Sequence, residues 1–445
     1  MPLTPEQETV WRRIQRAPQA YYNWGLPVRM LGELDVPALE GALTALVARH
    51  DALRARIVED GGGLSQRIAP AAPVALPLID LQHVPEAERD AAARSRVTDL
   101  CTLRLDPRGD RLWQASLLRL RPREHLLVLL VDELICDDRS RIVLMRDLTE
   151  LYEAASTGRS SRLPELEVSY ADYARRRRRW LAGEEAARQA RAWTDALAGA
   201  RPLELAVGPW LPERTLSGAP LFYQPSVALI RALRALVASE GVSLYVCLLA
   251  AFSALLATAA GRTDVVITTH TFNRLDEASE LLVGNFLTDL LMRCRWTGDP
   301  TFSELLRVAR RVTLDAYDRK ELPVWNVAGG LGWDDYRLRS PLAQYFLAVH
   351  DDRNPLPTPE GALDIQFEYV YLGQLFGDLG LFAYHNLGSD RLAVRLEHDV
   401  RLFDEAAVAR LRDALDALLT RASARPDARL STLLAGAAWL DPPDS

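Results

Sequence analysis

The chain has 445 residues, of which 49% are hydrophobic and 25% charged, and its net charge is −7. The length suits two domains of about 200 residues each, and the acidic balance excludes the overall basic footprint of a nucleic-acid-binding protein. The longest apolar run, residues 242–260, contains serines and a tyrosine and predicts no membrane span. The N-terminus has no apolar signal region, so we expect a cytoplasmic location.

Composition also argues against metal and redox chemistry. The four cysteines form no CxxC pair and lie in apolar surroundings, which predicts buried free thiols (Cys101, Cys136, Cys247 and Cys294). Neither a phosphate loop nor a metal-ligand spacing is present, so we expect no bound metal or nucleotide. The charge run Arg175–Arg179 predicts a solvated helix face, and contact with an acidic protein partner is the alternative.

Helices and strands alternate in the first half. Residues 4–16 predict a helix in which Thr4 and Gln7 form a capping box around Pro5. The apolar run LLVLLV predicts a central, buried strand within 124–134. The other predicted elements are a helix ending near Asp51, a hairpin that turns at Gly61, Gly62 and Gly63, a helix at 86–103, a strand at 113–120 and a helix at 138–156. The first half is therefore expected to place helices on a mixed sheet.

The second half shows a similar order. A linker and one long helix are expected within 162–197. Helices follow at 242–261, 302–319 and 404–423, and strands at 264–272, 342–349, 364–372 and 391–399. We expect an α/β fold with a first lobe at 1–175, a linker and helix at 176–200, and a second lobe at 201–445.

Several segments resemble one family along essentially the whole chain. These are PLTPEQ near the start, ARHDALRARI, LPELEVSYADYARRRRRWL, VGNFLTDLLMRC, GDPTFSELLRVAR and LEHDVRLFDEAAVARL. They resemble the condensation-domain superfamily of nonribosomal peptide synthesis. The resemblance implies two chloramphenicol-acetyltransferase-like lobes in a V-shaped pseudo-dimer with a central tunnel. It implies a monomer without a bound cofactor, whose substrates arrive on the phosphopantetheine arms of donor and acceptor peptidyl carrier proteins.

The signature of that family, HHxxxDG, is replaced here by DELICDD at 132–138. Both histidines are absent, and Asp138 stands in place of the glycine. The heterocyclization subfamily carries DxxxxDxxS instead, and Asp132, Asp137 and Ser140 match that pattern. Members of that subfamily join an acyl thioester to a cysteinyl, seryl or threonyl thioester and then close a thiazoline or oxazoline ring.

Other stretches depart from that subfamily. Its PVVFTS and QTPQVxLD segments, which supply the residues for ring closure, are not readable in QYFLAVHDD and GLFAYHNLGSD, where His350 and His385 stand. The segment LPVW is similar to ordinary condensation domains. The double aspartate Asp137 and Asp138 matches part of the HRxxxDD pattern of relatives that recruit oxygenases.

The residues in the motif suggest their roles. Glu133 takes the position of the second histidine, where a carboxylate can accept an ammonium proton; pairing with an arginine in an inactive tunnel is the alternative. Asp132 and Asp137 complete the catalytic candidates, although both also suit structural roles. The resemblance pairs Asp137 with Arg274 across the lobes, and Ser140, beside Asp138, suits a helix N-cap.

Four further candidates come from the histidines and their neighbours. His50 is expected to be a packed histidine that supports the site structurally. His270, Asn273 and His350 are expected to line the tunnel, although a core or surface position is the alternative for each histidine.

Two functions follow from these observations. The first is an amide-forming condensation or heterocyclization domain that acts on carrier-bound thioesters, with ring closure left open. The second is a catalytically degenerate domain that recruits a carrier protein or a tailoring partner.

Overall fold

The computed structural model describes residues 1–16, 22–60, 63–205, 218–328, 331, 344–351, 363–368, 370–373, 375 and 377–440. The chain divides into two compact units. The first comprises Met1–Glu185, Phe272–Leu287 and Leu356–Leu372, and the second comprises Ala186–Thr271, Thr288–Pro355 and Gly373–Ser445.

This division differs from the predicted lobes in two segments. Residues 201–445 were expected to form the second lobe as a block, but Phe272–Leu287 and Leu356–Leu372 belong to the first unit. The physical reason is strand pairing and burial, because both segments carry residues that pack into the first unit. The region expected to hold a linker and one long helix contains α5 (Tyr170–Leu181) and α6 (Glu184–Leu197).

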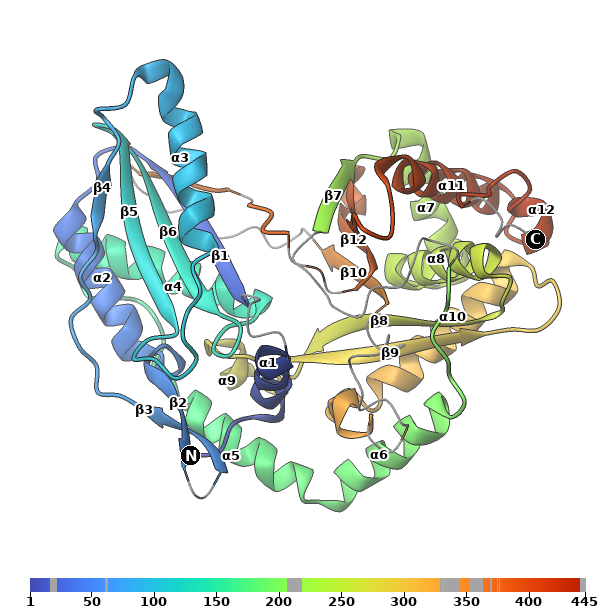
Figure 1. The fold of residues 1–445 in the computed structure, drawn as a ribbon, viewed down its shortest axis with the longest axis horizontal. Coiled ribbons are helices and arrows are strands. Elements are labelled where there is room, and N and C mark those ends of the chain that lie inside the picture. Colours follow the sequence, from blue (N-terminus) through green and yellow to red (C-terminus); the bar gives the residue numbers. More distant parts are fainter. Residues whose placement is uncertain are drawn as a thin grey trace. The chain divides into compact units, whose positions relative to one another are not determined.

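A five-stranded mixed sheet forms the centre of the first unit (Figure 1). Its strands, in order, are β11 (Asp364–Phe367), β1 (Asn23–Leu31), β6 (Glu124–Asp132), β5 (Trp113–Arg121) and β4 (Leu78–Asp80). Only β4 and β5 pair in parallel. A separate hairpin joins β2 (Ala55–Asp60) to β3 (Gly63–Ile68), and the Gly61 and Gly62 of its predicted turn lie outside the described residues. The predicted strand 364–372 is shorter than expected and joins this sheet rather than that of the second unit.

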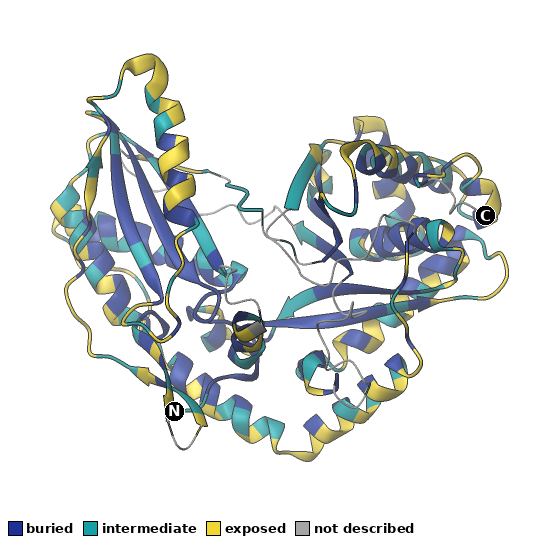
Figure 2. Ribbon diagram, viewed as in Figure 1, coloured by how far each residue is buried: buried dark blue, intermediate teal, exposed yellow. Residues whose placement is uncertain are grey.

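Helices cover both faces of this sheet, as the alternation along β6 requires. Leu127, Leu129 and Val131 share a core with α2 (Val36–Arg49) and α4 (Asp138–Thr157). Leu126 and Val128 share another core with α3 (Glu86–Cys101). Figure 2 shows β5 and β6 buried along most of their length and the outer side of α3 exposed. The prediction that this strand is central and buried is confirmed.

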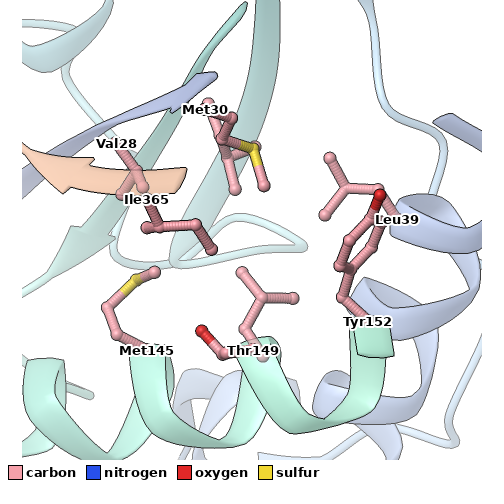
Figure 3. Close-up of a pocket in the computed structure, with 9 residues that line it drawn as sticks. Val28, Met30, Leu39, Met145, Thr149, Tyr152 and Ile365 are labelled. Atoms are coloured by element: carbon pink, nitrogen blue, oxygen red, sulfur yellow. The ribbon is translucent and has the colours of Figure 1, made fainter. Parts of the chain in front are cut away.

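A small apolar cavity lies in the first core, between the sheet and the two helices (Figure 3). Its volume is about 10 Å³, which is room for a single water molecule at most. The lining is Val28, Met30, Leu39, Leu127, Met145, Leu148, Thr149, Tyr152 and Ile365. It is therefore a packing gap and no substrate site.

The second unit is built on a six-stranded sheet. Its strands, in order, are β7 (Gly218–Tyr223), β13 (Arg391–Asp399), β12 (Leu379–Asn386), β10 (Tyr345–Asp351), β8 (Asp264–Phe272) and β9 (Leu287–Arg295). The helices α7 (Val227–Glu240), α8 (Leu244–Ala260), α10 (Phe302–Tyr317) and α11 (Glu405–Ala424) pack together beside it, with the short helix α12 (Leu430–Leu433) next to α11 (Figure 1). The short helix α9 (Glu277–Glu280) belongs to the first unit. The predicted strand 342–349 begins outside the described residues; β10 starts at Tyr345.

The segment Phe272–Leu287 connects β8 to β9 and packs into the first unit. Phe286 lies against the rings of Tyr170 and Tyr173 on α5, with centroid separations of 5.3 and 4.5 Å. Gly284 approaches so closely that a Cβ atom there would lie 2.2 Å from Cδ2 and Cε2 of Tyr170. Only glycine fits at this position, because any larger residue would displace a fully buried ring.

A glycine comparison tests this docking. We expect Gly284→Ala to destabilise the chain by roughly 1–3 kcal/mol through overpacking. Gly41→Ala is the matched control, because nothing lies within 4 Å of a Cβ atom there, and in the exposed part of α2 alanine should add up to about 1 kcal/mol of stability. Urea unfolding of both variants measures the difference; equal midpoints would contradict the close approach.

Candidate functional site

The N-terminal helix α1 (Pro5–Arg16) begins at the predicted capping box. The Thr4 hydroxyl accepts the N–H of Gln7 at 3.0 Å, and the Gln7 side chain accepts the N–H of Thr4 at 2.9 Å. Gln7 also donates through Nε2 to the carbonyl of Leu134 at 3.0 Å. The capping box is confirmed, and the same glutamine attaches α1 to the DELICDD loop.

Glu133 follows the last residue of β6 and is 7% exposed. Its Oε1 accepts from Nη1 of Arg13 at 3.1 Å. The backbone is also held: its N–H donates to the carbonyl of Tyr22 at 2.7 Å, and its carbonyl accepts from Nδ2 of Asn285 at 2.8 Å. The arginine that the second interpretation of Glu133 required is thus present. Sequence patterns did not identify Arg13, because it lies 120 positions away on an amphipathic helix.

Asp132 lies at the end of β6 with its side chain buried. Its Oδ1 accepts the N–H of Leu134 at 2.8 Å. Burial raises the pKa of Asp132 to about 8, the neighbouring charge of Glu133 raises it as well, and the Leu134 N–H opposes both. At neutral pH this carboxyl is therefore mostly protonated, which makes it a poor proton acceptor there.

Asp137 and Arg274 form a buried ion pair. Nη2 of Arg274 lies 3.2 Å from Oδ1 of Asp137, and the two side chains are 1% and 0% exposed. Oδ1 also accepts the N–H of Ser140 at 2.6 Å, and Oδ2 accepts the N–H of Phe286 at 3.0 Å. The guanidinium donates to the carbonyls of Ser279 and Leu282. The pairing is confirmed, and this network gives Asp137 a structural role in place of the catalytic one considered for it.

Two details of that prediction need correction. The pair was expected to cross between lobes, but both residues belong to the first unit because Phe272–Leu287 packs there. Ser140 was expected to be the helix N-cap, but Asp137 caps α4. The Ser140 hydroxyl instead donates to the carbonyl of Gly284 at 2.6 Å and accepts from Nη2 of Arg274 at 2.8 Å. Asp138 lies in the first turn of α4 and pairs with Arg141 at 3.2 Å.

A second buried ion pair corrects the interpretation of the arginine run. Arg177 is buried, and its Nη2 lies 2.9 Å from Oε1 of Glu6. The same carboxylate oxygen accepts from Nδ2 of Asn273 at 3.2 Å. Asn273 was expected to line the tunnel, but it is completely buried. The side-chain hydroxyl of Tyr173 donates to the Asn273 carbonyl at 3.2 Å.

His50 is buried, as expected of a packed histidine. Its Nε2 lies 2.9 Å from Oδ2 of Asp147, whose carboxylate also pairs with Arg49. Burial lowers the pKa of His50 against the opposing hydrogen bond from Asp147. The histidine therefore supports the packing of α2 against α4.

His270 and His350 lie in the second unit, on β8 and β10. Their ring centroids are 6.4 Å apart, and His350 stacks on Tyr384 at 4.9 Å. His385 lies on the adjacent strand β12, in register with Asp351. The described structure does not bring these histidines together with Glu133 in one unit.

The neighbouring strand β13 contributes a pair that sequence patterns missed. Nε of Arg395 lies 2.9 Å from Oε1 of Glu397, and its guanidinium lies 4.4 Å above the Phe382 ring. Burial raises the pKa of Glu397 to about 7, against the charge of Arg395. Its signal was present in RLAVRLEHD, where Arg395 and Glu397 occupy alternate positions and therefore share one face of the strand.

The four cysteines are free and buried, as predicted. Among the described residues, no three histidine, cysteine or acidic side chains are grouped as metal ligands would be. In the same part of the chain, no single helix is long and apolar enough to cross a membrane. The pair α7 and α8 reaches that length and composition together but bends by 103° between the helices.

Comparison with known proteins relates this fold to one class. The condensation-domain family model matches residues 1–436. A linear gramicidin synthase of Brevibacillus parabrevis is 31% identical over 437 residues, covering 96% of this chain but only 6% of that protein. The X-domain from teicoplanin biosynthesis, also solved in complex with OxyB, superposes with a TM-score of 0.87 at 26% identity, over 97% of this chain and 96% of that one. The first condensation domain of the calcium-dependent antibiotic synthetase gives a TM-score of 0.79 at 20% identity, over 96% and 97% of the two chains.

Two α/β units and a DELICDD loop held by a buried aspartate–arginine pair define a condensation-type fold. The family match covers almost the whole chain, so the chain belongs to the condensation-domain family of nonribosomal peptide synthetases. It spans a small fraction of the length of the synthetase that it resembles.

Breaking the Asp137–Arg274 pair should cost stability before it affects chemistry. We expect Asp137→Ala to lower the free energy of unfolding by ~3–5 kcal/mol, because it leaves a buried guanidinium uncompensated. Arg176→Ala is a suitable control: its pair with Asp276 is about two-fifths exposed, so it should cost less than about 1 kcal/mol. Similar unfolding midpoints for the two variants would contradict the role given to the buried pair.

Asp132 should make stability depend on pH. Between the unfolded pKa and the folded pKa of about 8, the native state retains a proton that the unfolded state releases. The contribution of Asp132 to stability is therefore complete at low pH and is lost as the pH rises through that window. Asp132→Asn stays neutral, so its stability relative to the wild type should increase by about 1–3 kcal/mol between about pH 5 and pH 8. Chemical denaturation across this range measures the slope; parallel curves would show that Asp132 ionises normally.

Proposed function

We propose that this condensation domain forms an amide between two carrier-bound thioesters, with Glu133 as the proton acceptor. One observation carries the proposal: Glu133 places a carboxylate at the position of the family's second histidine, on a loop whose buried supports are complete. The Glu133 carboxylate is held by Arg13, and its backbone is held at the N–H by Tyr22 and at the carbonyl by Asn285. The substrates would be delivered by donor and acceptor peptidyl carrier proteins on phosphopantetheine arms, without a bound cofactor.

The reaction requires one proton transfer. The acceptor amine attacks the thioester carbonyl of the donor, so a C–N bond forms and the nitrogen becomes positively charged. Glu133 accepts the proton from that nitrogen, and the C–S bond then breaks to release the phosphopantetheine thiolate, which recovers the proton. A positioned carboxylate supplies the acceptor that the missing histidine would have provided.

Ring closure is not part of the proposal. Asp137 and Ser140, two of the three residues that match the DxxxxDxxS pattern, are taken up by the buried pair with Arg274. The third, Asp132, is buried and bonded to the Leu134 N–H. The structural contacts of these three residues therefore account for their match to the pattern, and the proposal assigns them no ring-closing chemistry.

A second candidate function is recruitment of a partner protein. Its support is the likeness to the X-domain, which has been solved in complex with OxyB, together with the double aspartate at 137 and 138. In that case the pair of Arg13 and Glu133 would only stabilise the loop.

The substitution Glu133→Gln separates these functions. It keeps the shape of the side chain and removes its basicity, so we expect the single-turnover rate on loaded donor and acceptor carriers to fall by roughly 10²–10⁴-fold. Intact-protein mass spectrometry of the carriers measures the rate, normalised to folded protein.

Three other results would decide against the catalytic assignment. An unchanged rate for Glu133→Gln would end it. A loss of stability without a change in the rate per folded molecule would make Glu133 a structural anchor. No product from the wild type, combined with binding of a tailoring partner, would favour recruitment.

A further inference from the structure

We infer that Arg13 is a positioning residue for the Glu133 carboxylate, and that it acts on the reaction only through Glu133. The inference rests on the proposed function and extends it to α1, which the DELICDD motif does not include. Its basis is a set of contacts among Arg13, Glu133 and Tyr22.

Side chain and backbone contacts connect these three residues in a ring. Nη1 of Arg13 donates to Oε1 of Glu133 at 3.1 Å. The hydroxyl of Tyr22 donates to the carbonyl of Arg13 at 3.3 Å, and the carbonyl of Tyr22 accepts the N–H of Glu133 at 2.7 Å. Arg13 and Tyr22 therefore each contact Glu133 directly and are also bonded to each other.

The supports of this ring are themselves fixed. Gln7, which precedes Arg13 on the same helix, donates to the carbonyl of Leu134 at 3.0 Å. On the other side, Asn285 donates to the carbonyl of Glu133 at 2.8 Å while its own Oδ1 accepts the N–H of Leu287 at 3.0 Å. The backbone of Glu133 is thus held whether or not Arg13 is present, and what Arg13 adds is a contact to the carboxylate.

That contact has a chemical consequence. A side chain as flexible as glutamate must lose rotamer freedom before it can meet a substrate amine, and a guanidinium at 3.1 Å supplies this order in advance. Arg13 is 26% exposed at its side chain and Glu133 is 9% exposed, so water screens the pair less than a surface pair.

Substitution of Arg13 tests the inference, with the neighbouring Arg12 as control. Arg12 is 45% exposed and lies 3.8 Å from the carboxylate of Glu8, so Arg12→Ala should leave the rate unchanged. We expect Arg13→Ala to lower kcat by about 10–100-fold while KM for the acceptor carrier stays within twofold or so of the wild type. Arg13→Lys should recover part of the rate, and millimolar guanidinium should partly restore Arg13→Ala.

A double substitution shows whether Arg13 acts through Glu133. Adding Arg13→Ala to Glu133→Gln should lower the rate no further than Glu133→Gln alone. A multiplicative loss would overturn the inference, as would a rate for Arg13→Ala equal to that of Arg12→Ala. A loss that neither lysine nor guanidinium restores would also overturn it and give Arg13 a folding role.

Urea unfolding of the wild type, the two single variants and the double variant keeps this result separate from the proposed function. Coupling between the two substitutions in stability would establish the pair in solution even without any turnover. If the pair couples but the wild type forms no amide, the proposed function fails and Arg13 becomes an anchor of the loop. Absence of coupling would overturn the inference whatever the rate.

Discussion

A single buried carboxylate determines how the candidate site is built. Asp137 has no access to solvent, and burying an uncompensated charge is too costly for the fold to tolerate. Its neutralising partner, Arg274, lies 137 positions later in the sequence. The segment between β8 and β9 must therefore pack into the first unit, and it brings Gly284, Asn285 and Phe286 with it. Asn285 then holds the backbone of Glu133, so the charge pair and the reactive candidate belong to one arrangement.

Local sequence patterns predicted the structural features that depend on residues close together in the chain. The capping box of Thr4 and Gln7 follows from a spacing of three residues, and the central place of β6 follows from an unbroken apolar run. The pairing of Asp137 with Arg274 was predicted from family resemblance. It could not have come from spacing, since nothing local connects two residues so far apart.

What the sequence could not predict depends on contacts between distant segments. Arg177 looked like one of five solvated arginines, because its partner Glu6 lies 171 positions away. The same limit hid Arg13 behind Glu133 and Arg395 beside Glu397. Residues 364–367 read as a strand of the second lobe, yet they complete the first sheet, because an edge strand pairs wherever an unsatisfied neighbour is available. The alternation of apolar and polar residues along a strand does not indicate which sheet the strand joins.

The adjacent acids Asp132 and Glu133, which the resemblance places where the family has two histidines, occupy different environments. Asp132 is buried without a cationic partner among the described residues, so its pKa rises and it is mostly neutral at pH 7. Glu133 meets the guanidinium of Arg13. One carboxyl therefore has a raised pKa, while the next lies beside a guanidinium. Separate environments of this kind are how adjacent carboxyl groups acquire different roles in acid–base chemistry, and the proposed function assigns the role of proton acceptor to Glu133.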